Sequence, residues 1–142
     1  MRIADVLKAK GDSAVATIRG DADVSDLLAL LADRRIGAVV VSDDGQTIAG
    51  IVSERDIVRR LASAPDSLHA AVRDIMTSEV HTCEPETTVA DLSHEMTDRR
   101  IRHVPVVRDG RMIGLVSIGD VVKHRIDMLQ TEADHLTGYI NQ

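Results

Sequence analysis

Two segments of the chain place apolar residues at the spacing of one helix face. The apolar positions are Val24, Leu27, Leu28 and Leu31 in the first segment, and Val89, Leu92 and Met96 in the second. Recurrence after three and four residues is typical of an amphipathic helix. Asp23 and Thr88 stand immediately before the two segments, where a short polar side chain caps a helix. We therefore expect two helices that begin after these residues.

Two β-branched runs follow each predicted helix. They cover residues 37–41 and 103–107, and then the residues around Ile51 and Val116. An Asp-Gly pair separates the two runs of each copy, which is typical of a turn between strands. A short extended stretch carrying Thr17 or Thr82 precedes each helix, and a further helix begins near Asp56 or Asp120. The pattern predicts an α/β fold in which the order β-α-β-β-α occurs twice.

The two halves of this pattern are copies of one sequence. Residues 15–45 align with 80–110 at an offset of 65, residues 47–58 align with 111–122, and 18 of the 43 aligned pairs are identical. The identities concentrate in Asp-Arg-Arg-Ile, in Asp-Gly and in Gly-x-Val-Ser-x-x-Asp. A repeat of this length indicates duplicated structure.

Pro105 lies inside one of the predicted strands. Proline has no N–H group to donate to a neighbouring strand. This strand should therefore lie at a sheet edge or turn its missing bond toward a cavity, and we expect an opening beside Pro105.

Each copy carries a Ser-x-x-Asp motif where a strand gives way to a helix, at Ser53 with Asp56 and at Ser117 with Asp120. A serine followed three residues later by an acidic residue is a helix capping box, which is the structural interpretation. The same helix N-terminus offers free N–H groups to a phosphate, and a carboxylate there can accept two hydrogen bonds from a ribose diol. Capping and ligand binding can therefore coexist.

Composition narrows the classes of function. The formal net charge of −6 argues against a nucleic-acid partner, because binding to a phosphate backbone needs dense positive charge. Arginine pairs at 34–35, 59–60 and 99–100 could serve one small phosphate or lie on solvated helix surface. Cys83, the single cysteine, is expected to be a core residue in a reducing compartment. No apolar run approaches the roughly 20 residues that span a membrane, so we expect a cytoplasmic protein with no membrane partner.

The motifs resemble those of cystathionine-β-synthase (CBS) domains. GIVSERDIV at 50–58, GLVSIGDVV at 114–122 and IRHVPVV at 101–107 carry the resemblance, which covers about residues 1–125. It implies tandem CBS repeats, or a Bateman module, packed through their sheets about a pseudo-twofold axis with two clefts between them. It also implies that the clefts bind AMP, ADP, ATP, S-adenosylmethionine or a dinucleotide such as NAD(H), with no required cofactor.

The resemblance assigns roles by position. Asp56 and Asp120 would hold ribose hydroxyls, and Ser53 and Ser117 would contact ribose or phosphate. The other implied positions are Arg55, Arg102 and His103 toward phosphate, the backbone of Thr17, Thr82, Gly37, Ala38, Val39 and Val104 along the adenine, Ile36, Ile101 and Ile118 as apolar walls, and Pro105 beside the opening.

The two copies carry different cationic sets. Arg102 and His103 stand where the first copy has Gly37 and Ala38. Gly119 stands where the first copy has Arg55. Equal occupancy of the two clefts is therefore not expected.

Beyond the repeats, apolar residues continue at heptad spacing. They are Val122, Ile126, Leu129, Ala133, Leu136 and Ile140, and the opposite face carries Lys123, Asp127, Gln130 and Asp134. We call the first set the tail seam. Such a stripe can lie back on its own module or pair with a second copy, and we favour a homodimer.

A catalytic role is not expected, because the six histidines show no metal-ligand spacing and the sequence has no nucleophile-elbow, Walker or dinucleotide glycine motif. The sequence instead predicts a regulatory module that signals adenosine-ligand binding to an unidentified protein target or through its own dimer. The alternative is a ligand-independent dimeric scaffold. The predicted units are a lead-in helix and first repeat at 1–61, a linker at 62–71, a lead-in helix and second repeat at 72–126, and a helical extension at 127–142.

Overall fold

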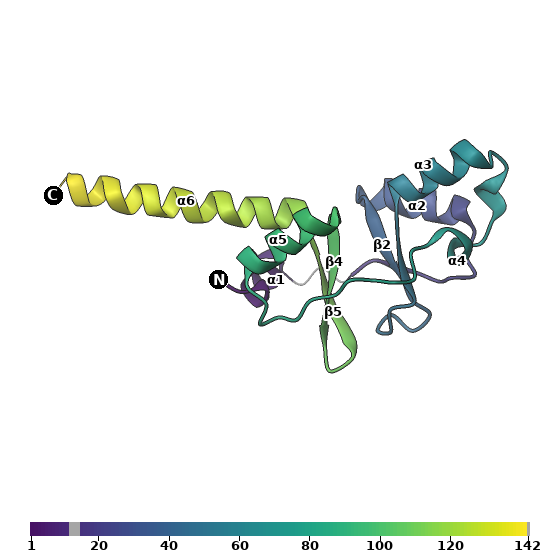
Figure 1. Cartoon of the computed structure of the whole chain (residues 1–142), viewed down its shortest axis with the longest axis horizontal. Coiled ribbons are helices and arrows are strands. Elements are labelled where there is room, and N and C mark those ends of the chain that lie inside the picture. The colour runs from purple at the N-terminus through teal and green to yellow at the C-terminus, as the bar shows by residue number, and fades with distance from the viewer. Residues whose placement is uncertain (12–14, 142) are drawn as a thin grey trace.

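The computed structural model describes residues 1–11 and 15–141, and Figure 1 shows two small α/β units that face each other through their sheets. The first unit contains β1 (Thr17–Ile18), α2 (Val24–Arg34), β2 (Ala38–Val41), β3 (Gly50–Ser53) and α3 (Glu54–Ser63). The second contains α5 (Val89–Arg99), β4 (His103–Arg108), β5 (Arg111–Ser117) and α6 (Ile118–Ile140). Three short helices complete the described part of the chain, namely α1 (Ile3–Lys10), the 3-10 helix η1 (Ser67–His69) and α4 (Val72–Ile75). The α/β class and the tandem repeats, packed about a pseudo-twofold axis, are confirmed.

The central helix of each unit begins at the predicted N-cap. Asp23 and Thr88 both have extended backbone before α2 and α5, and the Thr88 hydroxyl accepts a hydrogen bond from the Asp91 N–H at 3.1 Å. Each helix ends on an arginine in the left-handed conformation, Arg35 with φ 52° and Arg100 with φ 55°. The same local geometry therefore opens and closes both helices.

The two sheets differ because of one proline. In the first unit β1 pairs parallel to β2, with Thr17 opposite Val40, and β2 pairs antiparallel to β3. In the second unit β4 pairs with β5, and the preceding segment contributes a single parallel bridge between Cys83 and Val106. Pro105 occupies the position of Val40 and has no N–H to donate. The strand predicted at Thr82 is therefore reduced to this bridge.

The two lead-in helices are exchanged between the repeats. The helix α1, which leads into the first repeat, packs against the second, and α4, which leads into the second repeat, packs against the first. Ile3 and Val6 of α1 are buried in the core of the second unit, and the Ile3 N–H donates to the Thr87 carbonyl at 2.8 Å. Val72 of α4 is buried in the core of the first unit, and its N–H donates to the Ala22 carbonyl at 2.8 Å. In the sequence each lead-in helix comes directly before its own repeat, but in the fold each one packs into the core of the other repeat. This exchange connects the two units.

Gly50→Ala should lower the free energy of unfolding by about 1–3 kcal/mol. A Cβ at this position would lie 2.6 Å from Met76 Sδ and 2.8 Å from the Thr77 carbonyl oxygen. Gly114→Ala should cost less, because the atom 2.6 Å away is the end of a flexible leucine side chain of α1. Urea unfolding measures both, with Gly138→Ala as the control that meets nothing within 4 Å. Unchanged stability of Gly50→Ala would contradict the close contact between β3 and the α4 segment.

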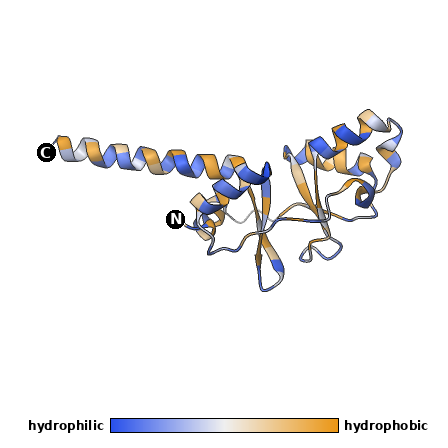
Figure 2. Cartoon of the chain, viewed as in Figure 1, coloured by the Kyte–Doolittle hydropathy of each residue, from blue (hydrophilic) through white to orange (hydrophobic). Residues whose placement is uncertain are grey.

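The long helix α6 continues beyond the second unit and exposes its apolar stripe (Figures 1 and 2). Ile126, Leu129, Leu136 and Ile140 are 59%, 50%, 65% and 79% exposed. The tail seam therefore does not lie back on its own module. None of the helices in the described ranges is both long and apolar enough to cross a bilayer.

Candidate functional site

Two clefts lie at the junction of the repeats. Their volumes are about 560 Å³ for cleft 1 and about 530 Å³ for cleft 2, within the 300–1,000 Å³ range typical of small-molecule sites. Gly37, Ala38 and His103 line both clefts. The clefts are therefore neighbours that share a wall.

Each cleft combines the Ser-x-x-Asp motif of one repeat with residues at and just before the start of β2 or β4 of the other. Cleft 1 takes Ser117 and Asp120 from the second repeat, and Ile36, Gly37 and Ala38 from the first. Cleft 2 takes Ser53, Arg55 and Asp56 from the first repeat, and Ile101, Arg102 and His103 from the second. A ligand in either cleft would bridge the two repeats, as the resemblance implied, and the structure adds which residues of each repeat meet in each cleft.

The two motifs cap their helices by the same hydrogen bonds. The Ser53 N–H donates to Asp56 Oδ2 at 2.8 Å, and the Asp56 N–H donates back to Ser53 Oγ at 3.4 Å. The corresponding distances between Ser117 and Asp120 are 2.9 and 3.2 Å. The capping interpretation is therefore correct, and both half-buried carboxylates also line a cleft.

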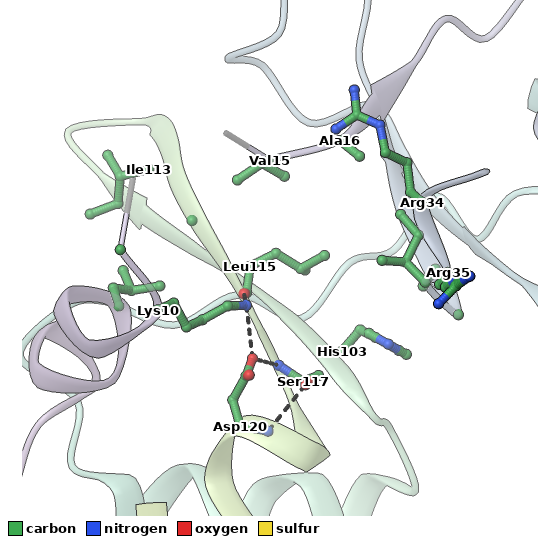
Figure 3. A pocket seen from close by; sticks show the side chains of 16 residues that line it. Lys10, Val15, Ala16, Arg34, Arg35, His103, Ile113, Leu115, Ser117 and Asp120 are labelled. Atoms are coloured by element: carbon green, nitrogen blue, oxygen red, sulfur yellow. Dashed lines mark hydrogen bonds and ion pairs between the residues drawn. The ribbon is translucent and has the colours of Figure 1, made fainter. Parts of the chain in front are cut away.

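Asp120 already has a cationic partner in cleft 1. Lys10, the last residue of α1, places Nζ 2.8 Å from Asp120 Oδ2 and 2.8 Å from the Leu115 carbonyl oxygen (Figure 3). Burial opposes ionisation of Asp120, but hydrogen bonds from Lys10 and Ser117 together with the Lys10 charge hold its pKa below the ordinary value. Asp56 forms no ion pair within the described residues. The two carboxylates thus differ in their availability to a ligand.

Lys10→Met should lower the free energy of unfolding at pH 7 by up to about 1 kcal/mol, because this partly exposed ion pair is screened by solvent. The lowered pKa of Asp120 means that the pair stabilises the fold above the ordinary pKa of 3.8 and loses its effect as the pH falls through the folded-state value. The difference from wild type should therefore shrink in acid.

Urea titrations at pH 7 and pH 3 measure this difference. Lys8→Met is the matched control, since Lys8 lies on the same helix and forms no ion pair in the part of the chain that the structure describes. Equal effects of Lys10→Met at both pH values would contradict the role of the pair.

His103 lies between the two clefts. Its ring stands near Gly37, where an added Cβ would be 3.6 Å from Cε1. Burial lowers the pKa of His103, while the Asp120 carboxylate opposes the shift. The imidazole is therefore neutral at pH 7 and can donate one hydrogen bond from one ring nitrogen.

The structure brings together most of the predicted site residues. Ile36, Gly37, Ala38, Ser117, Asp120 and His103 line cleft 1, and Gly37, Ala38, Ser53, Arg55, Asp56, Ile101, Arg102 and His103 line cleft 2. Thr17, Val39, Thr82, Val104, Pro105 and Ile118 lie outside both linings. Val39 and Val104 are fully buried. Their part in binding stays a prediction.

Several lining residues were not among the predicted site residues. They are Lys10, Arg34 and Arg35 in cleft 1, and Arg59, His81, Arg99 and Arg100 in cleft 2. The arginine pairs were visible in the sequence, but only the fold shows that residues of α3 and α5 meet in one cleft. His81 Nε2 also lies at hydrogen-bond distance, 2.6 Å, from Glu95 Oε2 of α5.

Two α/β repeats with exchanged lead-in helices and a pair of clefts at their junction define a tandem-repeat module. The CBS domain profile matches residues 4–63 and 72–127. The chain belongs to the CBS domain family and contains a tandem pair of these domains.

Two relatives show how far this similarity extends. The mitochondrial CBS domain-containing protein CBSX3 of Arabidopsis thaliana is 41% identical over 146 residues, which cover 97% of this chain and 71% of that protein. An uncharacterised protein of Thermofilum pendens is 34% identical over 127 residues, which cover 84% of this chain but 42% of that protein. The similarity therefore spans nearly all of this chain and only part of the longer relative.

Solved structures share the fold. A CBS-domain protein of Agrobacterium tumefaciens matches with a TM-score of 0.84 and 40% identity over 88% of this chain and 99% of that one. The CBS domain pair of protein MJ0100, in complex with methylthioadenosine and S-adenosyl-L-methionine, matches with a TM-score of 0.78 and 22% identity over 90% of this chain and 98% of that one. The second likeness concerns the fold alone.

Proposed function

We propose that this CBS pair is a non-catalytic regulatory sensor that binds an adenosine-containing ligand between its repeats. The observation that carries the proposal is the assembly of each cleft from both repeats, with a carboxylate at a helix N-terminus on one side and residues at the start of a strand on the other. A carboxylate in this position can accept hydrogen bonds from a ribose diol, and the helix N-terminus can receive a phosphate. The complex of the MJ0100 pair with two adenosine compounds supports the ligand class.

The proposed ligands are AMP, ADP, ATP and NAD(H), with cleft 2 as the stronger site. Asp56 is free of cationic partners among the described residues, whereas Asp120 is paired with Lys10. A ribose entering cleft 1 would have to compete with Lys10 for the carboxylate. This difference supports unequal occupancy of the clefts.

The proposed output is a change in the relation between the two repeats. A ligand that contacts α3 and β4 together selects the arrangement in which both contacts form, so binding shifts the population toward that state. The exposed tail seam on α6 offers a route to a second copy in a homodimer, and a protein target would respond to the same change. A cytoplasmic location is part of this proposal.

Thermal unfolding in the presence of adenosine, AMP, ATP, NAD and S-adenosylmethionine tests the function, with GTP as the control for the base. A ligand at 100 times its dissociation constant should stabilise the folded state by about 2.7 kcal/mol. Stabilisation by adenosine compounds but not by GTP supports the sensor. Unchanged melting with every adenosine compound would favour the ligand-independent scaffold.

A further inference from the structure

The lead-in helix of the first repeat is one turn longer than that of the second. Ile3 and Val72, the first residues of α1 and α4, occupy equivalent places in the fold. Their N–H groups donate to carbonyls at aligned positions of the two repeats, those of Thr87 and Ala22. From its first residue α1 continues for eight residues and α4 for four, and one turn of α-helix contains 3.6 residues. The last turn of α1, which ends at Lys10, therefore has no helical counterpart in α4.

The additional turn carries Lys10 into cleft 1 (Figure 3). Lys10 Nζ lies 2.8 Å from Asp120 Oδ2 and 2.8 Å from the Leu115 carbonyl oxygen. In the first repeat the aligned carbonyl, that of Ile51, accepts the backbone N–H of Thr77 at 2.8 Å. The ammonium group thus takes the place of a backbone donor, and it adds a positive charge beside Asp120.

The ion pair occupies one of the two oxygens that a ribose diol would bond. Asp120 Oδ2 accepts the Ser117 N–H at 2.9 Å and the Lys10 ammonium at 2.8 Å. Each carboxylate oxygen has about two acceptor positions, so Oδ2 is fully used. Two ribose hydroxyls can therefore bond both oxygens only after Lys10 has left. In cleft 2 the second bond to Asp56 Oδ2 comes from the Ser53 hydroxyl at 3.1 Å, which can rotate away.

We propose that the last turn of α1 is a latch on cleft 1, which an adenosine ligand has to release before its ribose can bond Asp120. The proposal rests on the proposed function and concerns the regulation of this cleft. The side chains of Lys10 and Asp120 are 34% and 22% exposed, and an ion pair that solvent screens is weak enough for a ligand to displace. Ile3 and Val6 hold the start of α1 in the core of the second repeat, so release concerns the last turn alone. Cleft 2 then fills first, and cleft 1 responds at a higher ligand concentration.

Calorimetric titration of adenosine tests the latch in a protein whose cleft 2 is weakened by Asp56→Asn. Adenosine has the ribose diol but no phosphate, so attraction between Lys10 and a phosphate cannot mask the competition for Asp120. Addition of Lys10→Met should raise the adenosine affinity of cleft 1 by about fivefold, the factor that corresponds to the loss of a partly exposed ion pair. If Asp56→Asn alone shows no measurable binding, measurable binding in the double variant is the expected gain. Melting curves verify that each variant is folded at the temperature of the titration.

Two control variants separate the charge at this position from other effects. Lys10→Arg keeps a cation beside Asp120 and should keep the low affinity of cleft 1. Lys8→Met removes a lysine from the same turn of α1 and should also leave the affinity unchanged. An equal gain in either control would overturn the latch. An unchanged or lower affinity in Lys10→Met would overturn it as well, and the lower value would make Lys10 a ligand-binding residue instead.

Failure of the latch is distinguishable from failure of the proposed function. Binding of adenosine to wild type, with no gain from Lys10→Met in the Asp56→Asn background, would overturn the latch and leave the function intact. Absence of adenosine binding to wild type and to every variant would overturn both.

Discussion

Asp56→Asn should weaken adenosine-nucleotide binding to cleft 2 by about 10- to 150-fold. The carboxylate at the N-terminus of α3 is the group placed to accept hydrogen bonds from ribose hydroxyls, and hydrogen bonds to a charged group contribute about 1.5–3 kcal/mol. Asparagine keeps one oxygen that can accept from the Ser53 N–H, now 2.8 Å from Asp56 Oδ2. The substitution therefore removes the charge while preserving most of the helix cap.

Calorimetry with AMP, together with a melting curve, separates binding from capping. Asp56→Ala also removes the oxygen that accepts from the Ser53 N–H, while the backbone N–H of residue 56 keeps its bond to Ser53 Oγ, so it should add a loss of about 1 kcal/mol in stability. Asp120→Asn is the matched variant in cleft 1 and should affect the tighter site little. Unchanged AMP affinity in Asp56→Asn would remove this residue from the binding site, and a severe loss of stability in that variant would favour capping as its sole role.

Leu129→Asp should abolish or strongly weaken the proposed homodimer. Leu129 lies at the middle of the tail seam and is 50% exposed in the single chain, although the pairing of a second copy would bury it. A carboxylate buried without a partner is costly. The variant should therefore be at least as damaging to association as deletion of residues 127–142.

Light scattering over a dilution series is the measurement for both variants. Gln130→Asp is the matched control, because it adds the same charge one residue away on the polar face and should leave association unchanged. A residual dimer after the deletion would indicate that helices of the module itself form part of the interface. A wild-type protein that is monomeric at micromolar concentration would contradict the homodimer, and unchanged association of Leu129→Asp and the deletion would exclude the seam from it.

The order of elements could be predicted because its signals are local. Helix periodicity and a capping residue define where α2 and α5 begin, and the Asp-Gly pairs define the hairpin turns. The Pro105 effect is also local, since a proline removes one N–H at a known position. The sequence did not show which segment pairs with the strand that contains Pro105. The consequence of the proline, a single bridge at Cys83 in place of a full strand, could therefore not be predicted.

The exchange of the lead-in helices could not be predicted in the same way. Periodicity shows that Ile3 and Val6 lie on one face of α1, but it does not show which core that face meets. Gly50 and Gly114 were conspicuous only as parts of the repeated motif, whereas the structure shows that each admits the lead-in segment of the other repeat.

The site was predictable to the extent that its residues belong to motifs. Ser53, Asp56 and their counterparts in the second repeat were identified from the repeated Ser-x-x-Asp, and they line the clefts. The partnership of Lys10 with Asp120, which are 110 residues apart, depends on the exchanged α1 and has no local signal. The convergence of the arginines of α3 and α5 on one cleft likewise depends on how the repeats face each other.

Amide hydrogen exchange with and without an adenosine nucleotide, tested as AMP and as ATP, examines most directly whether the ligand bridges the repeats. Saturating nucleotide should slow exchange in the first turn of α3, residues 54–56, and at the same time in residues 101–103 of the second repeat, because both segments line cleft 2. Unchanged exchange with both nucleotides, or protection confined to one repeat, would contradict a ligand site shared between the two CBS domains.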